Sequence, residues 1–315
     1  MTARKAQRLK KIENLKKKDR KTFSFNKLWL VFGLVIIAVI VFILLGKGTW
    51  DGESQLSMAF GSSQEDVLVI TVDPDSKKIV TIRIPKETTL DVANQLGSWP
   101  AGSVWDLGEN ENLGGTLLAN SITKTFKFPI ESWGSYNTLR LIKGNFFDKL
   151  SVIFSFDSTN LSFVDKIRLA ILSLQTPSAK RIEIDLADSS YLNEMKNFEG
   201  EIVYHLQGDI PTSILKIFSD STASAERLRI GIVNSGVNNE QINEVTKVME
   251  VLGTKVLSIR NSVENSDIDC EIRSNKKSVT ESKIAKIFDC KEGRLPKESN
   301  LDLEIEFGEG FASRF

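Results

Sequence analysis

Residues 28–46 read LWLVFGLVIIAVIVFILLG and contain no charged side chain, with Lys27 and Lys47 on either side. At about 1.5 Å per residue, a helix of this length spans roughly the hydrocarbon layer of a bilayer. A buried helix of a soluble domain normally carries a polar stripe, which is missing here. A cleaved signal peptide, the alternative, has a shorter apolar region that ends in small residues. We therefore predict a retained transmembrane helix over residues 28–46.

Charge is distributed unevenly along the chain. Residues 1–47 hold twelve lysines and arginines against Glu13 and Asp19, whereas the formal net charge of the whole chain is zero. The residues after Lys47 therefore carry a net charge of about −10. Because lysine and arginine resist translocation, we predict a cell-membrane protein that crosses the bilayer once. The arm over residues 1–27 stays cytoplasmic in this prediction, and the domains after Lys47 are extracytoplasmic.

The basic arm has a second interpretation, which is binding to nucleic acid. Beside a membrane span, however, orientation in the membrane and contact with lipid headgroups explain the arm without a further assumption. The arm also lacks a helix-turn-helix pattern. We therefore predict the lipid bilayer as a partner and no nucleic acid.

The two cysteines, Cys270 and Cys290, fall in the predicted extracytoplasmic part, where disulfides persist. Cys270 begins a segment typical of a strand, and Cys290 ends a segment typical of a helix. An antiparallel strand–helix pair would bring them together, and a disulfide would stabilise the fold by about 3 kcal/mol. Two unpaired buried thiols are the alternative, and the sequence leaves both open. His205 is the only histidine, which argues against a zinc site and a histidine-dependent hydrolase.

The extracytoplasmic part begins with residues 47–63, which are short, polar and glycine-containing and predict a tether. Two runs rich in β-branched residues follow and predict a hairpin over 67–85. Later segments predict a domain of α/β type over residues 64–218. Its further elements are a helix capped by Thr116, a strand over 150–156, a helix over 162–174, and strands over 181–187 and 201–207.

A second unit follows a small, polar stretch over residues 219–226, which predicts a linker. Residues 227–315 give the order β-α-β-β-α-β, a small sheet with two helices on one face. The predicted fold class is therefore α/β, with a single N-terminal transmembrane helix followed by two extracytoplasmic α/β domains.

Residues 227–315 resemble the LytR C-terminal domain through the strand IGIVNSG, the segment VMEVLGTKVLSI and the closing EIEFGEGF. Residues 64–218 resemble a degenerate catalytic domain of the LytR-CpsA-Psr family. This resemblance rests on the pair Glu65-Asp66, on VLVITVDPDSKKIVTI, on the run from Arg83 to Thr88, and on Gly114-Gly115.

The resemblance implies a specific chemistry. The family transfers a glycopolymer from a polyprenyl pyrophosphate carrier to the cell wall, with a metal held by aspartates and with arginines on the phosphates. A transferring phosphoryl group needs positive charge on its oxygens. By position, Glu65, Lys86 and Glu87 are the catalytic candidates. Arg83 and Lys86 are the phosphate-binding candidates, and Glu65 and Asp66 are the metal-binding ones.

The sequence departs from the family pattern at these positions. Lys86 and Glu87 stand where the family has arginine and aspartate, and Ser63 stands where an arginine is expected. A lysine lacks the planar fork that binds two phosphate oxygens at once. The arginine-rich stretch of the family has no counterpart in residues 150–220. The alternative interpretation of the candidate residues is that they are solvated side chains beside a strand and a turn.

We therefore predict a non-catalytic binding or scaffolding role at the cell envelope, with a wall glycan or an envelope protein as partner and no cofactor. The alternative is a divergent, Mg²⁺-dependent phosphotransferase that attaches polyprenyl-pyrophosphate-linked glycopolymers to the wall. Trp99, Trp105 and Trp133 have two interpretations, an aromatic platform for sugars or anchors of the core.

Overall fold

The computed structural model describes residues 30, 33, 48–196, 200–262, 267–296 and 299–315. The chain divides into two compact units, Met1–Gly48 and Thr49–Phe315, and the second unit contains all the elements described below. The basic arm and, apart from Leu30 and Gly33, the predicted transmembrane helix lie outside the described residues. Within the described ranges, no helix combines the length and the apolar composition needed to cross a membrane. The predicted α/β class is confirmed by the mixture of sheets and helices in the second unit.

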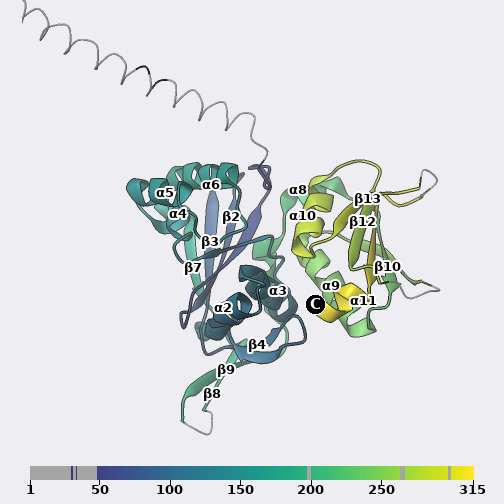
Figure 1. Ribbon diagram of the computed structural model, residues 1–315, viewed down its shortest axis with the longest axis horizontal. Coiled ribbons are helices and arrows are strands. Elements are labelled where there is room, and N and C mark those ends of the chain that lie inside the picture. The colour runs from purple at the N-terminus through teal and green to yellow at the C-terminus, as the bar shows by residue number, and fades with distance from the viewer. Residues whose placement is uncertain (1–29, 31–32, 34–47, 197–199, 263–266, 297–298) are drawn as a thin grey trace, which may run out of the picture. The chain divides into compact units, whose positions relative to one another are not determined.

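A five-stranded sheet, called the first sheet, begins the second unit (Figure 1). Its order is β6-β1-β2-β3-β7, with antiparallel pairing of β1, β2 and β3 and a parallel strand at each edge. The strands are β1 (Leu56–Gly61), β2 (Val67–Asp73), β3 (Lys78–Ile84), β6 (Ser132–Ser135) and β7 (Arg181–Asp185). The predicted hairpin is confirmed as β2 and β3.

Strand β1 occupies the region predicted to be a tether. All six of its residues are buried, and Trp50, which precedes it, is 3% exposed. The prediction of a tether over residues 47–63 is therefore wrong. The sequence LSMAFG contains no β-branched residue, so its pattern does not indicate a strand. Its conformation depends on pairing with β2 on one side and β6 on the other.

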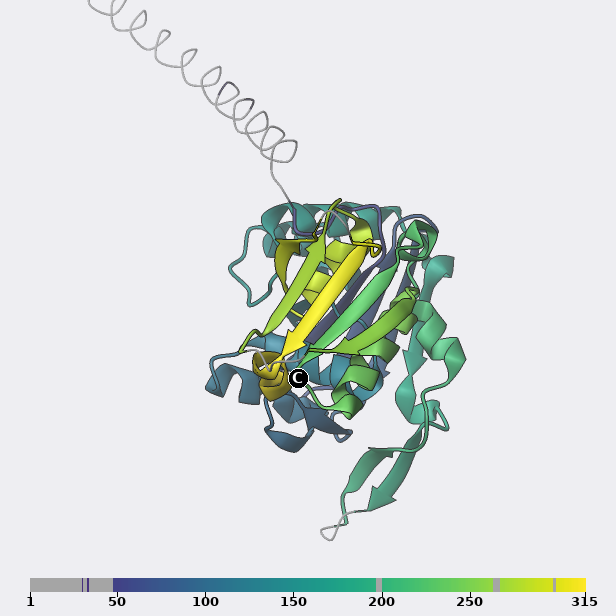
Figure 2. The same cartoon turned by 90° about the vertical axis from the view of Figure 1, so that its right-hand side faces the viewer.

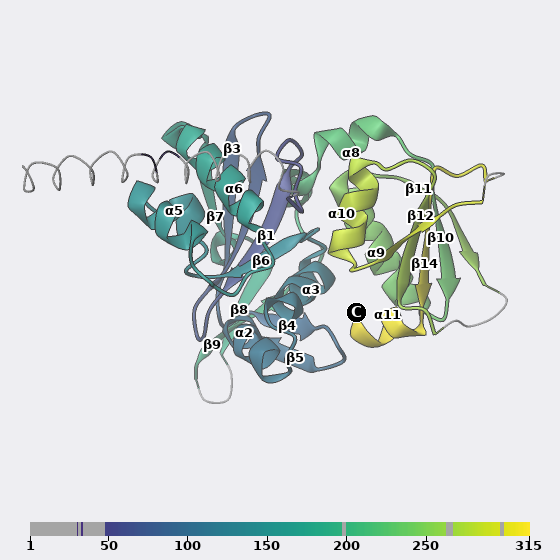
Figure 3. The ribbon, with the colours of Figure 1, turned by 45° about the horizontal axis from the view of Figure 1, so that its top comes forward.

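Helices cover both faces of the first sheet (Figures 1 and 3). One layer contains α2 (Ala101–Asn110) and α3 (Gly115–Phe126), and the other contains α4 (Arg140–Lys143), α5 (Phe146–Ile153) and α6 (Phe163–Gln175). Side chains of β2 alternate between these layers, as the two-residue period of a strand requires. Val67 and Val69 pack with α2 and α3, whereas Leu68 and Ile70 pack with the α4–α6 layer.

Two glycines fix the start of α3. Gly114 is the N-cap and has φ 55°, in the region that favours glycine. A Cβ on Gly115 would lie 2.3 Å from Cε3 of Trp133. The helix thus begins before Thr116, the predicted cap. Trp133 packs edge-on against the buried Trp105, with ring centroids 6.1 Å apart, so these two rings belong to the core.

The strand predicted over residues 150–156 is wrong, because helix α5 ends within this segment. The segment LSVIFSF is apolar apart from Ser151 and Ser155, and a short, mainly apolar run does not distinguish a helix from a strand. The helix is started by a capping box, in which Asn145 accepts from the backbone N–H of Asp148 and the Asp148 side chain accepts from the backbone N–H of Asn145. This cap lies upstream of the segment on which the strand prediction was based.

Shorter elements complete the first half of the unit. They comprise β4 (Thr89–Val92) paired with β5 (Gly97–Pro100), β8 (Leu192–Lys196) paired with β9 (Ile202–Leu206), α7 (Thr212–Leu215), and 3₁₀ turns at Ser178–Lys180, Leu186–Asp188 and Lys216–Phe218. Trp99 lies on β5 and is 41% exposed, apart from the core tryptophans. The three tryptophans therefore do not form one aromatic platform.

A second five-stranded sheet, called the second sheet, has the order β11-β10-β14-β12-β13 (Figure 2). Its strands are β10 (Ile230–Ser235), β11 (Val256–Asn261), β12 (Cys270–Ser274), β13 (Lys291–Arg294) and β14 (Leu303–Gly308). Helices α9 (Asn239–Leu252) and α10 (Val279–Ile287) share one core with the sheet. The predicted elements occur in the predicted order, with β13 and the final helix α11 (Glu309–Arg314) in addition.

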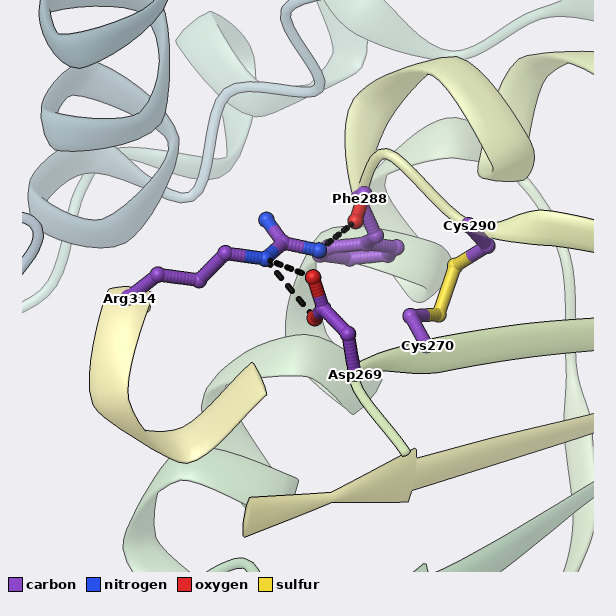
Figure 4. The surroundings of a disulfide bond; sticks show 5 residues. All are labelled: Asp269, Cys270, Phe288, Cys290 and Arg314. Atoms are coloured by element: carbon purple, nitrogen blue, oxygen red, sulfur yellow. Dashed lines mark hydrogen bonds and ion pairs between the residues drawn. A yellow bond between two sulfur atoms is a disulfide. The ribbon is translucent and has the colours of Figure 1, made fainter. Parts of the chain in front are cut away.

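Cys270 and Cys290 form a disulfide, with their Cα atoms 4.5 Å apart (Figure 4). It joins the start of β12 to the segment after α10. Beside it, Nε of Arg314 lies 2.8 Å from both carboxylate oxygens of Asp269, and Nη2 donates to the backbone oxygen of Phe288. The last helix is thus held to the chain on both sides of the disulfide.

A buried group of charges connects the two sheets. Nζ of Lys283, on α10, lies 2.6 Å from Oε1 of Glu131 and 3.3 Å from Oδ2 of Asp220, and it also donates to the backbone oxygen of Gln55. The three charged side chains are at most 2% exposed. Glu131 precedes β6, and Asp220 is the N-cap of α8 (Ser221–Glu226). The predicted linker over 219–226 is therefore a capped helix with a buried carboxylate.

We predict that Lys283→Met lowers the free energy of unfolding by about 3–5 kcal/mol, because it leaves two buried carboxylates without their cation. Denaturant unfolding followed by circular dichroism measures this change. Lys276→Met, at an exposed position, is the control and changes little. Adding Glu131→Gln and Asp220→Asn to Lys283→Met recovers part of the loss. A full-sized loss that these additions do not reduce would contradict the charge-based explanation.

Candidate functional site

The family resemblance points to the region where β2 begins and β3 ends. Arg83 lies near the end of β3 and pairs in register with Asp185, which ends the parallel strand β7. Nε of Arg83 is 2.9 Å from Oδ2 of Asp185, and Nη2 donates to the same oxygen. Nη1 is 3.3 Å from Oδ2 of Asp66, the residue before β2. The Arg83 guanidinium is therefore held between two carboxylates.

Asp66 is bonded through all three of its oxygens. Besides Arg83 on Oδ2, the backbone N–H of Lys86 donates to Oδ1 over 2.9 Å, and the hydroxyl of Tyr136 donates to the backbone oxygen over 2.6 Å. Burial, followed by the charges of Asp66 and Glu65, raises the pKa of Tyr136 to about 12. With both carboxylate oxygens engaged inside the protein, Asp66 joins β2, β3 and Tyr136 together.

The backbone brings the segments of Glu65 and Lys86 together at the first turn of α2. The N–H of Gln64 donates to the oxygen of Gly102 over 3.0 Å, and the N–H of Gly102 donates to the oxygen of Lys86 over 2.9 Å. A Cβ on Gly102 would lie 2.7 Å from Cβ of Lys86, so this close approach requires glycine. The side chains of Glu65 and Lys86 are nevertheless exposed, and Glu87 is half-buried.

Carboxylates dominate the surroundings of Arg83. The hydrogen bond and charge of Asp185 raise the pKa of Arg83, and Asp66 and Asp188 contribute in the same direction. Nε, Nη1 and Nη2 of Arg83 each donate to one of these carboxylates, so a phosphate would have to share the guanidinium with Asp66 and Asp185. The arrangement is therefore that of a structural ion pair.

The two metal-binding candidates differ in their surroundings, because the side chain of Glu65 is exposed and that of Asp66 is hydrogen-bonded. Asp66 already uses its two carboxylate oxygens for Arg83 and Lys86, and Mg²⁺ is bound through carboxylate oxygens. Among the residues that the structure describes, no three or more histidine, cysteine, aspartate or glutamate side chains form a group that could hold a metal ion.

Sequence reasoning did not identify Asp185 or Tyr136 as neighbours of the candidate residues. Asp185 lies 102 positions after Arg83, and only the pairing of β3 with β7 brings it there. The one local signal is that Asp185 lies within the strand predicted over residues 181–187, which ends at Asp185 in the structure.

A cleft of about 680 Å³ lies elsewhere in the second unit and is lined by none of the candidate residues. Its walls come from the end of α3, from Tyr191, from the segment 206–219 and from α9. The apolar side chains are Tyr191, Leu206, Ile210, Leu215 and Val251, and the charged ones are Lys127, Asp209, Lys216, Lys247 and Glu250. Burial, followed by the charge of Asp209, raises the pKa of Tyr191.

The cleft has a fixed wall between α3 and α9. Nζ of Lys127, the C-cap residue of α3, lies 2.6 Å from Oε1 of Glu244 on α9. Sequence reasoning missed this cleft because its lining comes from separate segments that share no motif.

No protein-family model matches the chain, and no curated protein matches it. Solved structures with partial similarity include TagV of Bacillus subtilis, with a TM-score of 0.37 and 10% identity over 52% of this chain and 94% of that chain. TagT (YwtF), a LytR-CPS2A-psr family protein with bound octaprenyl pyrophosphate lipid, gives a TM-score of 0.35 and 12% identity over 50% of this chain and 85% of that chain.

A transcriptional regulator from Enterococcus faecalis gives a TM-score of 0.36 and 12% identity, over 64% of this chain and 89% of that chain. All of these TM-scores are below 0.5. The similarities therefore carry no conclusion about this chain, and its function is inferred from its own residues.

We predict that Arg83→Gln lowers the free energy of unfolding by about 1 kcal/mol, because exposed ion pairs each contribute a fraction of this amount. Glu65→Gln and Lys86→Gln are matched controls at exposed positions and change stability by less than about 0.5 kcal/mol. Denaturant unfolding measures all three. If Lys86→Gln costs more than Arg83→Gln, the assignment of Arg83 as the structural cation is wrong.

Proposed function

We propose that this chain is a single-pass membrane protein of the cell envelope whose extracytoplasmic part binds envelope material and does not transfer it. The apolar segment 28–46 and the basic arm before it support the membrane anchor. The sequence resemblance to LytR-CpsA-Psr proteins supports a role at the envelope.

The main observation in support of a non-catalytic role is that Arg83 is paired with carboxylates. In an enzyme that transfers phosphoryl groups, cationic side chains face the phosphate oxygens. Here the guanidinium is bonded to Asp66 and Asp185, and the carboxylate that the resemblance assigns to a metal is bonded in turn to Arg83 and to the backbone of Lys86. These residues stabilise the strand ends.

The cleft beside α9 is the proposed binding site. Its half-buried apolar side chains, Leu206, Ile210, Leu215 and Val251, offer surface to the apolar faces of sugar rings, and its polar side chains offer hydrogen bonds. Three lysines against two acidic residues give the lining a slight positive balance in an otherwise acidic extracytoplasmic part. The proposed ligand class is therefore a glycan of the cell wall, with acidic substituents favoured over basic ones.

The proposed orientation predicts that a protease added to intact cells degrades the part after Thr49 and spares the basic arm. Immunoblotting with a tag at each end of the chain measures this. Permeabilised cells are the control, in which both ends are degraded. A carboxy-terminal part that is cut only after permeabilisation would refute the orientation.

For the cleft, we predict that the full chain in detergent binds soluble cell-wall glycan fragments and that Lys216→Glu with Lys247→Glu weakens this binding at least about tenfold, as the loss of two charge-assisted contacts implies. Isothermal titration calorimetry measures the affinity. Lys276→Glu with Lys277→Glu makes the same charge change outside the cleft and is the control.

The same preparation tests the enzymatic alternative. Farnesyl pyrophosphate, incubated with the full chain and Mg²⁺, remains intact under our proposal. Phosphate or pyrophosphate release that is lost in Lys86→Ala or Glu87→Ala would establish the phosphotransferase and overturn the binding role.

A further inference from the structure

Helices α5 and α6 expose a concentration of large apolar side chains. Of fourteen large apolar side chains that are exposed among the described residues, seven lie on α5, on α6 or in the turn between them. We call these seven the α5–α6 surface: Phe146, Phe147, Leu150, Phe154, Phe156, Ile171 and Leu174. Phe147 is 77% exposed and Phe156 is fully exposed. A cluster of this kind on a folded protein marks an interaction surface.

The exposed apolar side chains of α5 are spaced so that they lie on one side of the helix. Phe147, Leu150 and Phe154 recur at i, i+3 and i+7, which places them on one side of α5, whereas Lys149 and Val152 point into the protein. Ile171 and Leu174 continue the exposed side on α6. The ring of Phe154 contacts that of Phe163 at the start of α6, with centroids 5.8 Å apart, so the two helices are joined through an aromatic pair.

The start of the second unit is fastened to α6. The backbone N–H and the hydroxyl of Thr49 donate to Oδ2 of Asp165 over 3.0 and 2.5 Å, and the N–H of Trp50 donates to Oδ1 over 3.1 Å. Arg168 donates to the backbone oxygen of Trp50. Burial by itself would raise the pKa of Asp165, but these hydrogen bonds together with that from Ser162 lower it, so the carboxylate is the favoured form.

This attachment leaves little chain between α6 and the apolar segment. Three Cα–Cα steps separate position 46, where the apolar segment ends, from Thr49, and they span at most about 11 Å. The headgroup layer on each side of a bilayer is about 5–8 Å thick. If residues 28–46 cross a bilayer, the first turn of α6 therefore lies in or next to the headgroups.

The charge around the surface suits lipid headgroups. Residues 132–182 contain seven lysines and arginines against three aspartates, and five against two remain when the buried Lys149, Lys166 and Asp165 are left out. The whole part after Lys47, in contrast, has a net charge of about −10. The local excess of positive charge favours anionic headgroups, and apolar side chains on a helix face insert at the boundary between headgroups and acyl chains.

From these observations we propose that the α5–α6 surface inserts into the outer leaflet of the bilayer that the chain crosses and holds the extracytoplasmic part against the membrane. The proposal rests on the membrane anchor of the proposed function. The proposed partner of the α5–α6 surface is a phospholipid bilayer, because the short connection from the apolar segment to α6 keeps α6 near that bilayer.

The test uses the full chain with a single introduced thiol, since Cys270 and Cys290 form a disulfide. Phe147→Cys carries a bimane label in vesicles of phosphatidylcholine and phosphatidylglycerol, with and without doxyl-labelled lipid as the quencher. Met195→Cys, an exposed apolar position on β8, is the matched control. We expect loss of bimane emission at position 147 and none at position 195, and a smaller loss at 147 in phosphatidylcholine alone.

Three outcomes decide the matter. Equal quenching at the two positions overturns the proposal. Emission at 147 that changes with the protein-to-lipid ratio but not with the quencher shows a second copy on the surface, and also overturns it. Quenching of a label at Phe156→Cys that is abolished by Leu150→Asp with Phe154→Asp supports it. Flotation of the chain with the vesicles is measured separately, so failure of the anchor is distinguished from failure of the surface.

Discussion

The ion group around Lys283 is the interaction on which the association of the two sheets depends. Its ammonium binds a carboxylate from the first half of the unit, Glu131, and another from the connecting segment, Asp220. Two buried carboxylates and one ammonium carry a net negative charge, so their desolvation is expensive. Burial accordingly raises the pKa of Glu131, although Lys283 opposes this, and its Oε2 has no hydrogen-bond partner among the described atoms. Glu131 and Asp220 thus obtain their counter-ion from α10, which packs with the second sheet.

In the candidate region, the charged side chains at the ends of β2, β3 and β7 bind one another. Arg83, Asp66 and Asp185 satisfy one another, and the strands that carry them are held by the result. In phosphoryl transfer, cationic groups are directed at the phosphate oxygens, and this contrast is the basis of the proposed binding role. The cleft of about 680 Å³ is lined instead by residues of α9 and of the segment after β9, whose charged side chains no motif connects.

Much of the fold was predictable where local signals agree. The β2–β3 hairpin has two β-branched runs, and α6 and α10 each begin with a serine capping box. Strand β1 was not predictable, because its pairing partners and not its composition make it a strand. Helix α5 was misread because its cap lies upstream of its apolar run. Lys283 lies 63 residues after Asp220 and 152 residues after Glu131, and Asp185 lies 102 residues after Arg83. At such separations a single sequence gives no local signal of a contact.

The location of the tryptophans has a spectroscopic consequence. The chain has five, and all of them precede residue 134, so the second sheet contains none and is rich instead in phenylalanine contacts around Phe288 and Phe311. Tryptophan fluorescence therefore does not report directly on the second sheet. If the half that contains the second sheet unfolded alone, circular dichroism would change while the emission of Trp105 and Trp133 stayed the same. Comparing the two signals therefore shows whether the two halves unfold in one cooperative transition or one after the other.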